Sequence, residues 1–170
     1  MLELSGELAD GVITHGITDA LTKYCLDKVA VGAKRTGRNA KAVDYVSFTT
    51  ILPSKTPDLM KDLLKPRNFS LVGGEYSEEL IPLYGLSIEE VAPLRTSVKR
   101  GDFKKAGSLM TNKMMDAFLI VGSTDQCLEQ VAKMVKMGVT HFITNIPQVK
   151  GVDGKQFLED VSRIAAHFRS

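Results

Sequence analysis

Three runs of apolar and β-branched residues stand out along the chain and predict buried strands. Their sequences are GVITH at 11–15, VDYVSFTTIL at 43–52 and VTHFITNIP at 139–147. Each run is rich in residue types that favour extended backbone, and Pro53 closes the second run. The runs are nearly continuous in apolar residues, which is typical of parallel strands with both faces buried.

The stretches between these runs have helical spacing. Residues 2–9 resemble the tail of a helix that ends at Asp10-Gly11, and Gly37 and Gly138 end two later helices. Each of these later helices, and three more, has a start at which a hydroxyl or carboxylate side chain can cap the first backbone amides. The expected starts are Thr18, Thr56, Ser87, Ser123 and Asp153.

Apolar side chains recur at helical spacing behind three of these starts, and they predict which face of each helix is buried. The expected inner faces are Leu21, Tyr24, Cys25, Lys28, Val29 and Gly32 after Thr18; Leu128, Val131, Ala132 and Val135 after Ser123; and Phe157, Val161, Ile164, Ala165 and Phe168 after Asp153.

Residues 56–118 form a long segment between the second and third predicted strands. Its pattern is helical, but prolines and glycines interrupt it from residue 66 onward. A structureless loop of this length is unusual inside a compact domain, so the segment predicts an insertion of several short helices.

This order of elements predicts an α/β fold. Strands separated by helices imply parallel pairing with right-handed crossovers. With 170 residues the chain is expected to form a single domain, 1–170, with a core of its own. Three parallel strands make a very small sheet with two apolar edges, which predicts self-association or a partner chain.

The composition narrows the function further. A formal net charge of +2 argues against a nucleic-acid-binding protein, and no apolar run approaches the roughly 18 residues of a membrane span. Cys25 and Cys127 have no metal-binding or CxxC spacing, so reduced, packed thiols in a cytoplasmic protein are expected. The basic cluster within 99–105 is a solvated face or a contact for an acidic ligand tail.

Several segments carry a family resemblance. LELSGELADGVI (2–13), GEYSEELIPLYGLS (74–87), the following EEVAPLR, and MMDAFLIVGSTDQCLEQVAKMVKMGVTHFI (114–143) resemble the C-terminal part of luciferase-like, deazaflavin-dependent oxidoreductases. The archaeal methylenetetrahydromethanopterin reductases are the members they resemble most. The resemblance implies a (β/α)8 TIM-barrel-like fold of roughly twice this length, of which this chain would form about strands six to eight.

In such a barrel the functional groups lie at the carboxyl ends of the strands. Thr14, His15 and Gly16 end the first predicted strand, and Asn145 ends the third. The resemblance implies that this edge contacts the phosphate-bearing side chain of the cofactor, with free backbone amides at 17–19 facing the anion. The alternatives are that His15 makes a polar end to a buried strand and that Asn145 initiates a turn.

Other polar residues are weaker candidates. Thr49 and Thr50 are explained by strand propensity, and His141, within the third predicted strand, is expected to be a packing residue. No catalytic residue is assigned, and no metal-binding or phosphate-loop motif occurs in the sequence.

Three functions remain open from the sequence. The first is the C-terminal part of an oxidoreductase that uses the deazaflavin coenzyme F-420, or alternatively flavin mononucleotide (FMN), and transfers hydride to a C1-carrying pterin. It would act as a homo-oligomer or with an N-terminal barrel partner chain. The second is a truncated, non-catalytic module for cofactor binding or dimerisation. The third is a reading frame in which Met1 is internal to a longer protein.

Overall fold

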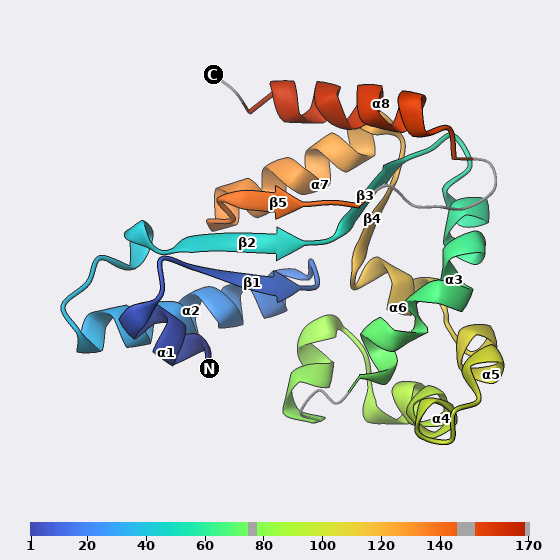
Figure 1. Cartoon of the computed structure of the whole chain (residues 1–170), viewed down its shortest axis with the longest axis horizontal. Coiled ribbons are helices and arrows are strands. Elements are labelled where there is room, and N and C mark those ends of the chain that lie inside the picture. Colours follow the sequence, from blue (N-terminus) through green and yellow to red (C-terminus); the bar gives the residue numbers. More distant parts are fainter. Residues whose placement is uncertain (75–77, 146–151, 169–170) are drawn as a thin grey trace.

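Helices alternate with short parallel strands in the computed structural model of the chain (Figure 1), as the sequence predicted. The structure describes residues 1–74, 78–145 and 152–168. The strands are β1 (Gly11–His15), β2 (Asp44–Phe48), β3 (Thr50–Pro53), β4 (Leu119–Gly122) and β5 (His141–Ile143). The helices are α1 (Leu2–Leu8), α2 (Asp19–Arg35), η1 (Ala40–Ala42), α3 (Pro57–Gly73), η2 (Glu78–Tyr84), α4 (Ile88–Lys99), α5 (Phe103–Ser108), α6 (Asn112–Asp116), α7 (Thr124–Met137) and α8 (Gly154–Ala166).

The strands form two small parallel sheets. In the first, β2 lies between β1 and β5, with Gly11 opposite Asp44 and Val46 opposite His141. In the second, β3 pairs with β4, and Thr50 lies opposite Leu119. Apart from β2 and β3, which follow each other directly, successive strands are joined through helices, as in a (β/α)8 barrel.

The second predicted strand is the main correction to the strand assignment. Residues 43–52 do not form one strand: β2 and β3 are separated at Thr49, whose backbone N–H still donates to Ile143 O at 3.0 Å. Beyond this point the chain leaves the first sheet and pairs with β4, a strand that the sequence pattern did not predict. β4 has only four residues, and so short an apolar run cannot be distinguished from a helix segment by its periodicity.

The third predicted strand, 139–147, is shorter in the structure. β5 covers only His141–Ile143, and residues 146–147 lie outside the part of the chain that the structure describes.

The two faces of the first sheet differ in burial. Tyr45 and Ser47 on one face are 2% and 0% exposed, and Tyr45 lies against Cys25 of α2. On the other face, Ile13 is 61% exposed and Ile143 is 43% exposed. The expectation that both faces are buried is therefore wrong for this sheet, because no second layer of the described residues covers the face that carries Ile13.

The segment between β3 and β4 is helical, as predicted, and most of its helices are short, but α3 has 17 residues and continues through Pro66. Figure 1 shows β1, β2 and β5 pointing toward this group, α3 to α6. Pro66 lies inside α3 and Pro82 inside η2, so neither proline ends its helix. The buried side chains Leu64 and Leu94 belong to the same core cluster as residues of β3 and α7. The insertion thereby forms a wall next to the carboxyl ends of the strands.

The predicted inner faces of the helices are correct for α2 and partly correct for α7 and α8. In α7, Cys127, Val131 and Met134 are buried, whereas Val135 is 38% exposed. The buried face of α7 is therefore displaced by about one residue from the predicted face. The pattern did not distinguish the two faces, because apolar residues lie on each of them. In α8, Phe157 and Ile164 are buried as expected, but Ala165 is exposed. Within the described ranges, no helix has the length and apolar character needed to cross a membrane.

Candidate functional site

A cavity of about 160 Å³ lies at the carboxyl ends of β1, β2 and β5. Strand ends supply part of its lining, and the insertion supplies the rest. The lining residues are His15, Phe48, Thr49, Thr50, Asn68, Leu71, Phe118, Leu119 and Asn145. Two of the four predicted cofactor contacts, His15 and Asn145, are thus brought together from opposite parts of the chain.

His15 is the last residue of β1 and Phe48 is the last residue of β2, and the register places them side by side. Their ring centroids are 4.8 Å apart and the ring planes are inclined by 49°. The imidazole and the phenyl ring form one rim of the cavity. A planar or anionic group at this rim would contact an aromatic face and an imidazole nitrogen at the same time.

Asn145 lies two residues after β5, and Thr50 orients its side chain. The Thr50 hydroxyl donates to Oδ1 of Asn145 at 2.8 Å, and the backbone N–H of Ile51 donates to the hydroxyl of Thr144 at 3.0 Å. These two bonds fix the end of β5 against the start of β3. Because Oδ1 of Asn145 is occupied as an acceptor, the two N–H donors of its amide are the groups it can offer to a ligand.

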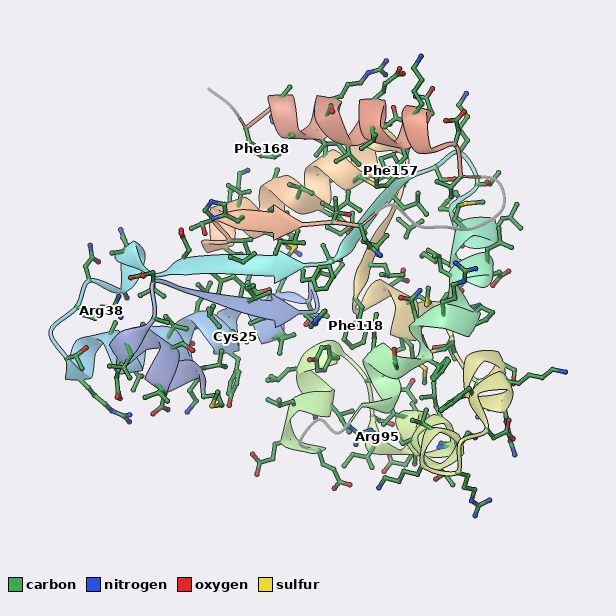
Figure 2. All side chains as sticks on the ribbon, in the orientation of Figure 1. Cys25, Arg38, Arg95, Phe118, Phe157 and Phe168 are labelled. Atoms are coloured by element: carbon green, nitrogen blue, oxygen red, sulfur yellow. The ribbon has the colours of Figure 1, made fainter. Side chains whose placement is uncertain are left out.

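Phe118 closes the opposite side of the cavity. Its ring stacks on Tyr84 of η2, with centroids 4.8 Å apart, and its carbonyl accepts a hydrogen bond from the buried Thr49 hydroxyl. Figure 2 shows Phe118 between the strand ends and the insertion. Asn68 reaches the cavity from α3, where its amide donates to Leu64 O at 2.9 Å.

The sequence analysis missed the three cavity-lining residues of the insertion, Asn68, Leu71 and Phe118. No motif marks any of them, since each reaches the cavity only because the insertion folds back on the strand ends. Thr49 and Thr50 were attributed to strand propensity alone, yet both line the cavity.

Thr14 lies on the other face of the sheet. Its hydroxyl donates to Oη of Tyr45 at 2.8 Å, on the side that packs against α2, and Thr14 does not line the cavity. Burial raises the pKa of Tyr45, so its phenol stays protonated at neutral pH. The Thr14 hydroxyl therefore stabilises the packing of the sheet against α2 and does not face the cavity.

Gly16 makes the sharp turn between β1 and α2. Its φ is 99°, and an added Cβ would lie 2.6 Å from Cδ2 of Leu21 and 2.8 Å from Cε1 of Tyr84. The backbone amides expected to face an anion are not all free, because the N–H of Ile17 donates to Ala117 O at 3.0 Å. The Thr18 hydroxyl accepts from Leu21 N and donates to Leu83 O. Backbone carbonyls of the insertion thus accept the hydrogen bonds that the Ile17 amide and the Thr18 hydroxyl could otherwise offer to an anion.

His141 differs from its expected role. It is exposed rather than packed in a core, its Nδ1 lies 2.9 Å from the Thr140 hydroxyl, and the same nitrogen is 3.6 Å from a carboxylate oxygen of Asp44. It does not line the cavity.

The two thiols are buried and packed, as expected. Burial raises the pKa of Cys25, and it raises the pKa of Cys127 to about 11. Burial thus favours the neutral thiol at both positions, which is the opposite of the activation that a nucleophilic cysteine needs. Among the residues that the structure describes, no group of three or more metal-ligating side chains occurs.

A larger cavity of about 700 Å³ lies between β3, α7 and α8. Its charged lining is mixed, with the cations Lys55 and Arg163 beside the carboxylates of Asp125, Asp153 and Asp160. It contains none of the four predicted cofactor contacts, and its charges favour neither an anionic nor a cationic ligand.

Comparison with known proteins places this geometry in a family. A family model described as luciferase-like monooxygenase matches residues 1–141, which is most of the chain. The chain belongs to this luciferase-like family. The cavity at the strand ends is therefore the carboxyl-terminal edge of a partial luciferase-like barrel.

The curated proteins to which this luciferase-like chain is similar in sequence include 5,10-methylenetetrahydromethanopterin reductases. That of Methanolobus tindarius is 28% identical over 148 residues, covering 86% of this chain and 45% of the relative. That of Methanopyrus kandleri is 26% identical over 170 residues, covering 99% of this chain and 48% of the relative. The chain spans about half the length of these relatives.

Solved structures agree with the family assignment. The coenzyme F-420 dependent tetrahydromethanopterin reductase from Methanopyrus kandleri has a TM-score of 0.82 at 25% identity, covering 99% of this chain and 48% of that one. The long-chain alkane monooxygenase LadA has a TM-score of 0.57 at 17% identity, covering 98% of this chain and 38% of that one, and it shows a shared fold only.

Proposed function

We propose that this luciferase-like chain is the C-terminal part of an oxidoreductase that uses coenzyme F-420 and transfers hydride to a C1-carrying pterin. The observation that carries the proposal is the meeting of His15 and Asn145 in one cavity at the strand ends. The resemblance to the methylenetetrahydromethanopterin reductases implies cofactor contact at this edge, and the similarity in sequence and structure supports it.

The residues of the cavity fit one portion of such a coenzyme. The amide of Asn145 and the imidazole of His15 can donate hydrogen bonds to phosphate oxygens, while Phe48 and Phe118 supply aromatic walls. The volume of about 160 Å³ is below the range typical of whole-ligand pockets, so only part of the coenzyme fits here. FMN is the alternative ligand because it also has a phosphate.

When bound, the coenzyme supplies the hydride chemistry, and the role of the chain is to bind and orient it. Asn145 is held by Thr50, so its donors point in a fixed direction before a ligand arrives. Phe118, buried and stacked on Tyr84, supplies an apolar inner wall. A cytoplasmic location and a pterin substrate are parts of the proposal that rest on the resemblance.

A second function has a specific observation in its favour. The cavity lining includes no carboxylate among the described residues, and His15 is the one ionisable side chain in it. A lining of amide, hydroxyl, aromatic and one imidazole side chain suits coenzyme binding, which is all that the non-catalytic cofactor-binding module requires. Under either function, the remaining strands of the barrel would come from a second copy or from an N-terminal barrel partner chain.

The test is a fluorescence titration of the 170-residue chain with coenzyme F-420, and with FMN in parallel. We expect saturable micromolar binding, weakened about tenfold or more in Asn145→Ala, since one bond to a charged group contributes about 1.5 to 3 kcal/mol. His167→Ala, an exposed histidine near the end of α8, is the control for His15→Ala. Equal affinity in wild type, Asn145→Ala and His15→Ala would contradict the site, and absence of binding to both ligands would contradict the function.

A further inference from the structure

A groove of about 510 Å³ lies between α3 and α5, on the surface of the insertion. Pro66 and Phe69 of α3 line one side of it, and Phe103 and Lys104 of α5 line the other. Figure 1 shows α5 at the outer edge of the insertion, away from β1, β2 and β5. The groove is therefore separate from the cavity at the strand ends.

Helix α3 presents different sides to the groove and to the cavity. Lys65 and Phe69 line the groove, whereas Asn68 and Leu71 line the cavity. At about 3.6 residues per turn, these two pairs of residues lie on different sides of the helix. The groove thus belongs to the outer surface of the insertion and not to the uncovered face of the first sheet.

The floor of the groove is aromatic, and close packing holds it in place. The rings of Phe69 and Phe103 are stacked, with centroids 5.4 Å apart and planes inclined by 17°. Gly107 lets α5 approach α3 closely, since an added Cβ would lie 3.0 Å from Cα of Pro66. Phe103 nevertheless remains 55% exposed, so part of the stacked pair is accessible to a partner.

Four exposed cations lie within four residues of Phe103 in the chain, namely Lys99, Arg100, Lys104 and Lys105. We call these four residues the basic rim. Among the residues that the structure describes, none of the four has a carboxylate within ion-pair distance. The other lysines of the insertion are all paired, Lys61 with Asp116, Lys65 with Asp62 and Lys113 with Glu90.

Local structure does not account for this excess of positive charge. Lys104 lies in the first turn of α5, where the helix dipole disfavours a cation. The one carboxylate within 99–105, Asp102, caps α5 by accepting a hydrogen bond from the backbone N–H of Lys105 at 3.1 Å. A negatively charged partner would offset the repulsion among the four cations.

We propose that the groove and the basic rim bind an acidic segment of a partner polypeptide. An aromatic side chain of that segment stacks on Phe103, and its carboxylates lie against the basic rim. Charge complementarity guides such a partner to the site, and an aromatic anchor in a groove is typical of the residues that dominate binding. An anionic membrane is less well matched, because a groove receives a narrow segment whereas a bilayer surface is broad.

Fluorescence anisotropy of a labelled peptide, titrated with the 170-residue chain without coenzyme, tests the groove. The probe is a fluorescein-labelled synthetic peptide in which one phenylalanine is flanked on both sides by glutamates. A second peptide has lysines in place of the glutamates. We expect saturable binding of the glutamate peptide, weaker as salt rises because exposed charges are screened, and no binding of the lysine peptide. Failure of the glutamate peptide to bind would overturn the proposal.

Phe103→Ala tests the aromatic floor. We expect the dissociation constant for the glutamate peptide to rise about tenfold, as for the loss of an anchor residue. Leu158→Ala, on the outer surface of α8 at 52% exposure, is the matched control and should bind as wild type does. Because both side chains are exposed, circular dichroism should show both variants folded. Equal affinity in wild type and Phe103→Ala would overturn the proposal.

The double variant Lys104→Glu, Lys105→Glu tests the basic rim. It should weaken binding of the glutamate peptide and reduce the salt dependence of binding. Lys34→Glu combined with Lys136→Glu makes the same change in net charge at exposed positions on α2 and α7, and it should bind as wild type does. An equal loss in the two double variants would overturn the proposal, since net charge alone would then explain binding.

Vesicles that contain phosphatidylserine form a further arm of the test. Binding of the chain to these vesicles, without binding of the glutamate peptide, would overturn the proposal and assign the basic rim to a membrane surface. Because no coenzyme is present in any arm, failure here leaves the titration result for the proposed function unaffected.

Discussion

The hydroxyl of Thr50 donates a hydrogen bond to Oδ1 of Asn145 across 2.8 Å. Thr50 begins β3, and Asn145 follows β5, so the bond joins two segments that are far apart in the sequence. It sets the direction in which the amide of Asn145 points into the cavity. The orientation of a predicted cofactor contact thus depends on a threonine that strand propensity alone would explain.

Replacing Thr50 with valine should show how much the orientation of the Asn145 amide contributes to coenzyme binding, because Asn145 itself is left unchanged. Thr50→Val keeps the shape of the side chain but removes the donor, so Asn145 loses its fixed orientation. We expect the free energy of unfolding to fall by about 1 kcal/mol in urea denaturation, and coenzyme affinity to fall several-fold in the fluorescence titration. Thr96→Val, at an exposed position on α4, controls for the loss of a hydroxyl. Unchanged affinity in Thr50→Val would show that the orientation of Asn145 does not matter.

Gly16 should tolerate no side chain. In Gly16→Ala the residue would keep an unfavourable positive φ, and its Cβ would overlap Leu21 and Tyr84. We expect a loss of about 3 kcal/mol, from backbone strain and overpacking together. Gly37→Ala is the matched control, since its φ is 69° and no atom lies within 4 Å of the added Cβ. Its loss, from strain alone, should be about 1 kcal/mol.

Chemical denaturation of both glycine variants gives the comparison. If Gly16→Ala and Gly37→Ala were equally destabilised, the contact between the turn after β1 and Tyr84 of the insertion would contribute nothing beyond backbone conformation.

The buried thiol of Cys127 should make stability depend on alkaline pH. Its pKa rises from 9.0 to about 11 on folding, so the unfolded chain releases the proton at lower pH than the folded chain does. This contribution to stability is complete below pH 9.0 and is lost as the pH rises to about 11. The loss should be on the order of 2 kcal/mol.

Urea denaturation at a series of pH values between 8 and 11, compared between wild type and Cys127→Ala, measures this contribution. The variant retains the other titrating groups, so the difference between the two slopes isolates the thiol. Parallel slopes would mean that Cys127 ionises in the folded protein as it does in the unfolded chain.

The helix starts were determined by the sequence itself. The capping boxes at Ser87 and Ser123 form as predicted, and Thr18 and Asp153 each cap a helix through their side chains. Thr56 precedes α3 as predicted, but its side chain makes no capping hydrogen bond. Gly37 and Gly138 follow the ends of α2 and α7 with positive φ. These features depend on residues within about four positions of one another, so the local sequence specifies them without reference to the rest of the fold.

Only the tertiary structure decided which residues meet. The separation of β2 from β3 at Thr49 depends on β4, a strand almost seventy residues later in the chain. Phe118 and Asn68 reach the cavity because the insertion packs on the strand ends, and Ile13 is exposed because none of the described residues packs over that face of the first sheet. Contacts between distant segments decide which strands pair, which sheet face is covered and which residues line the cavity. The periodicity of the sequence predicts helices and strands but does not predict which of them will be in contact.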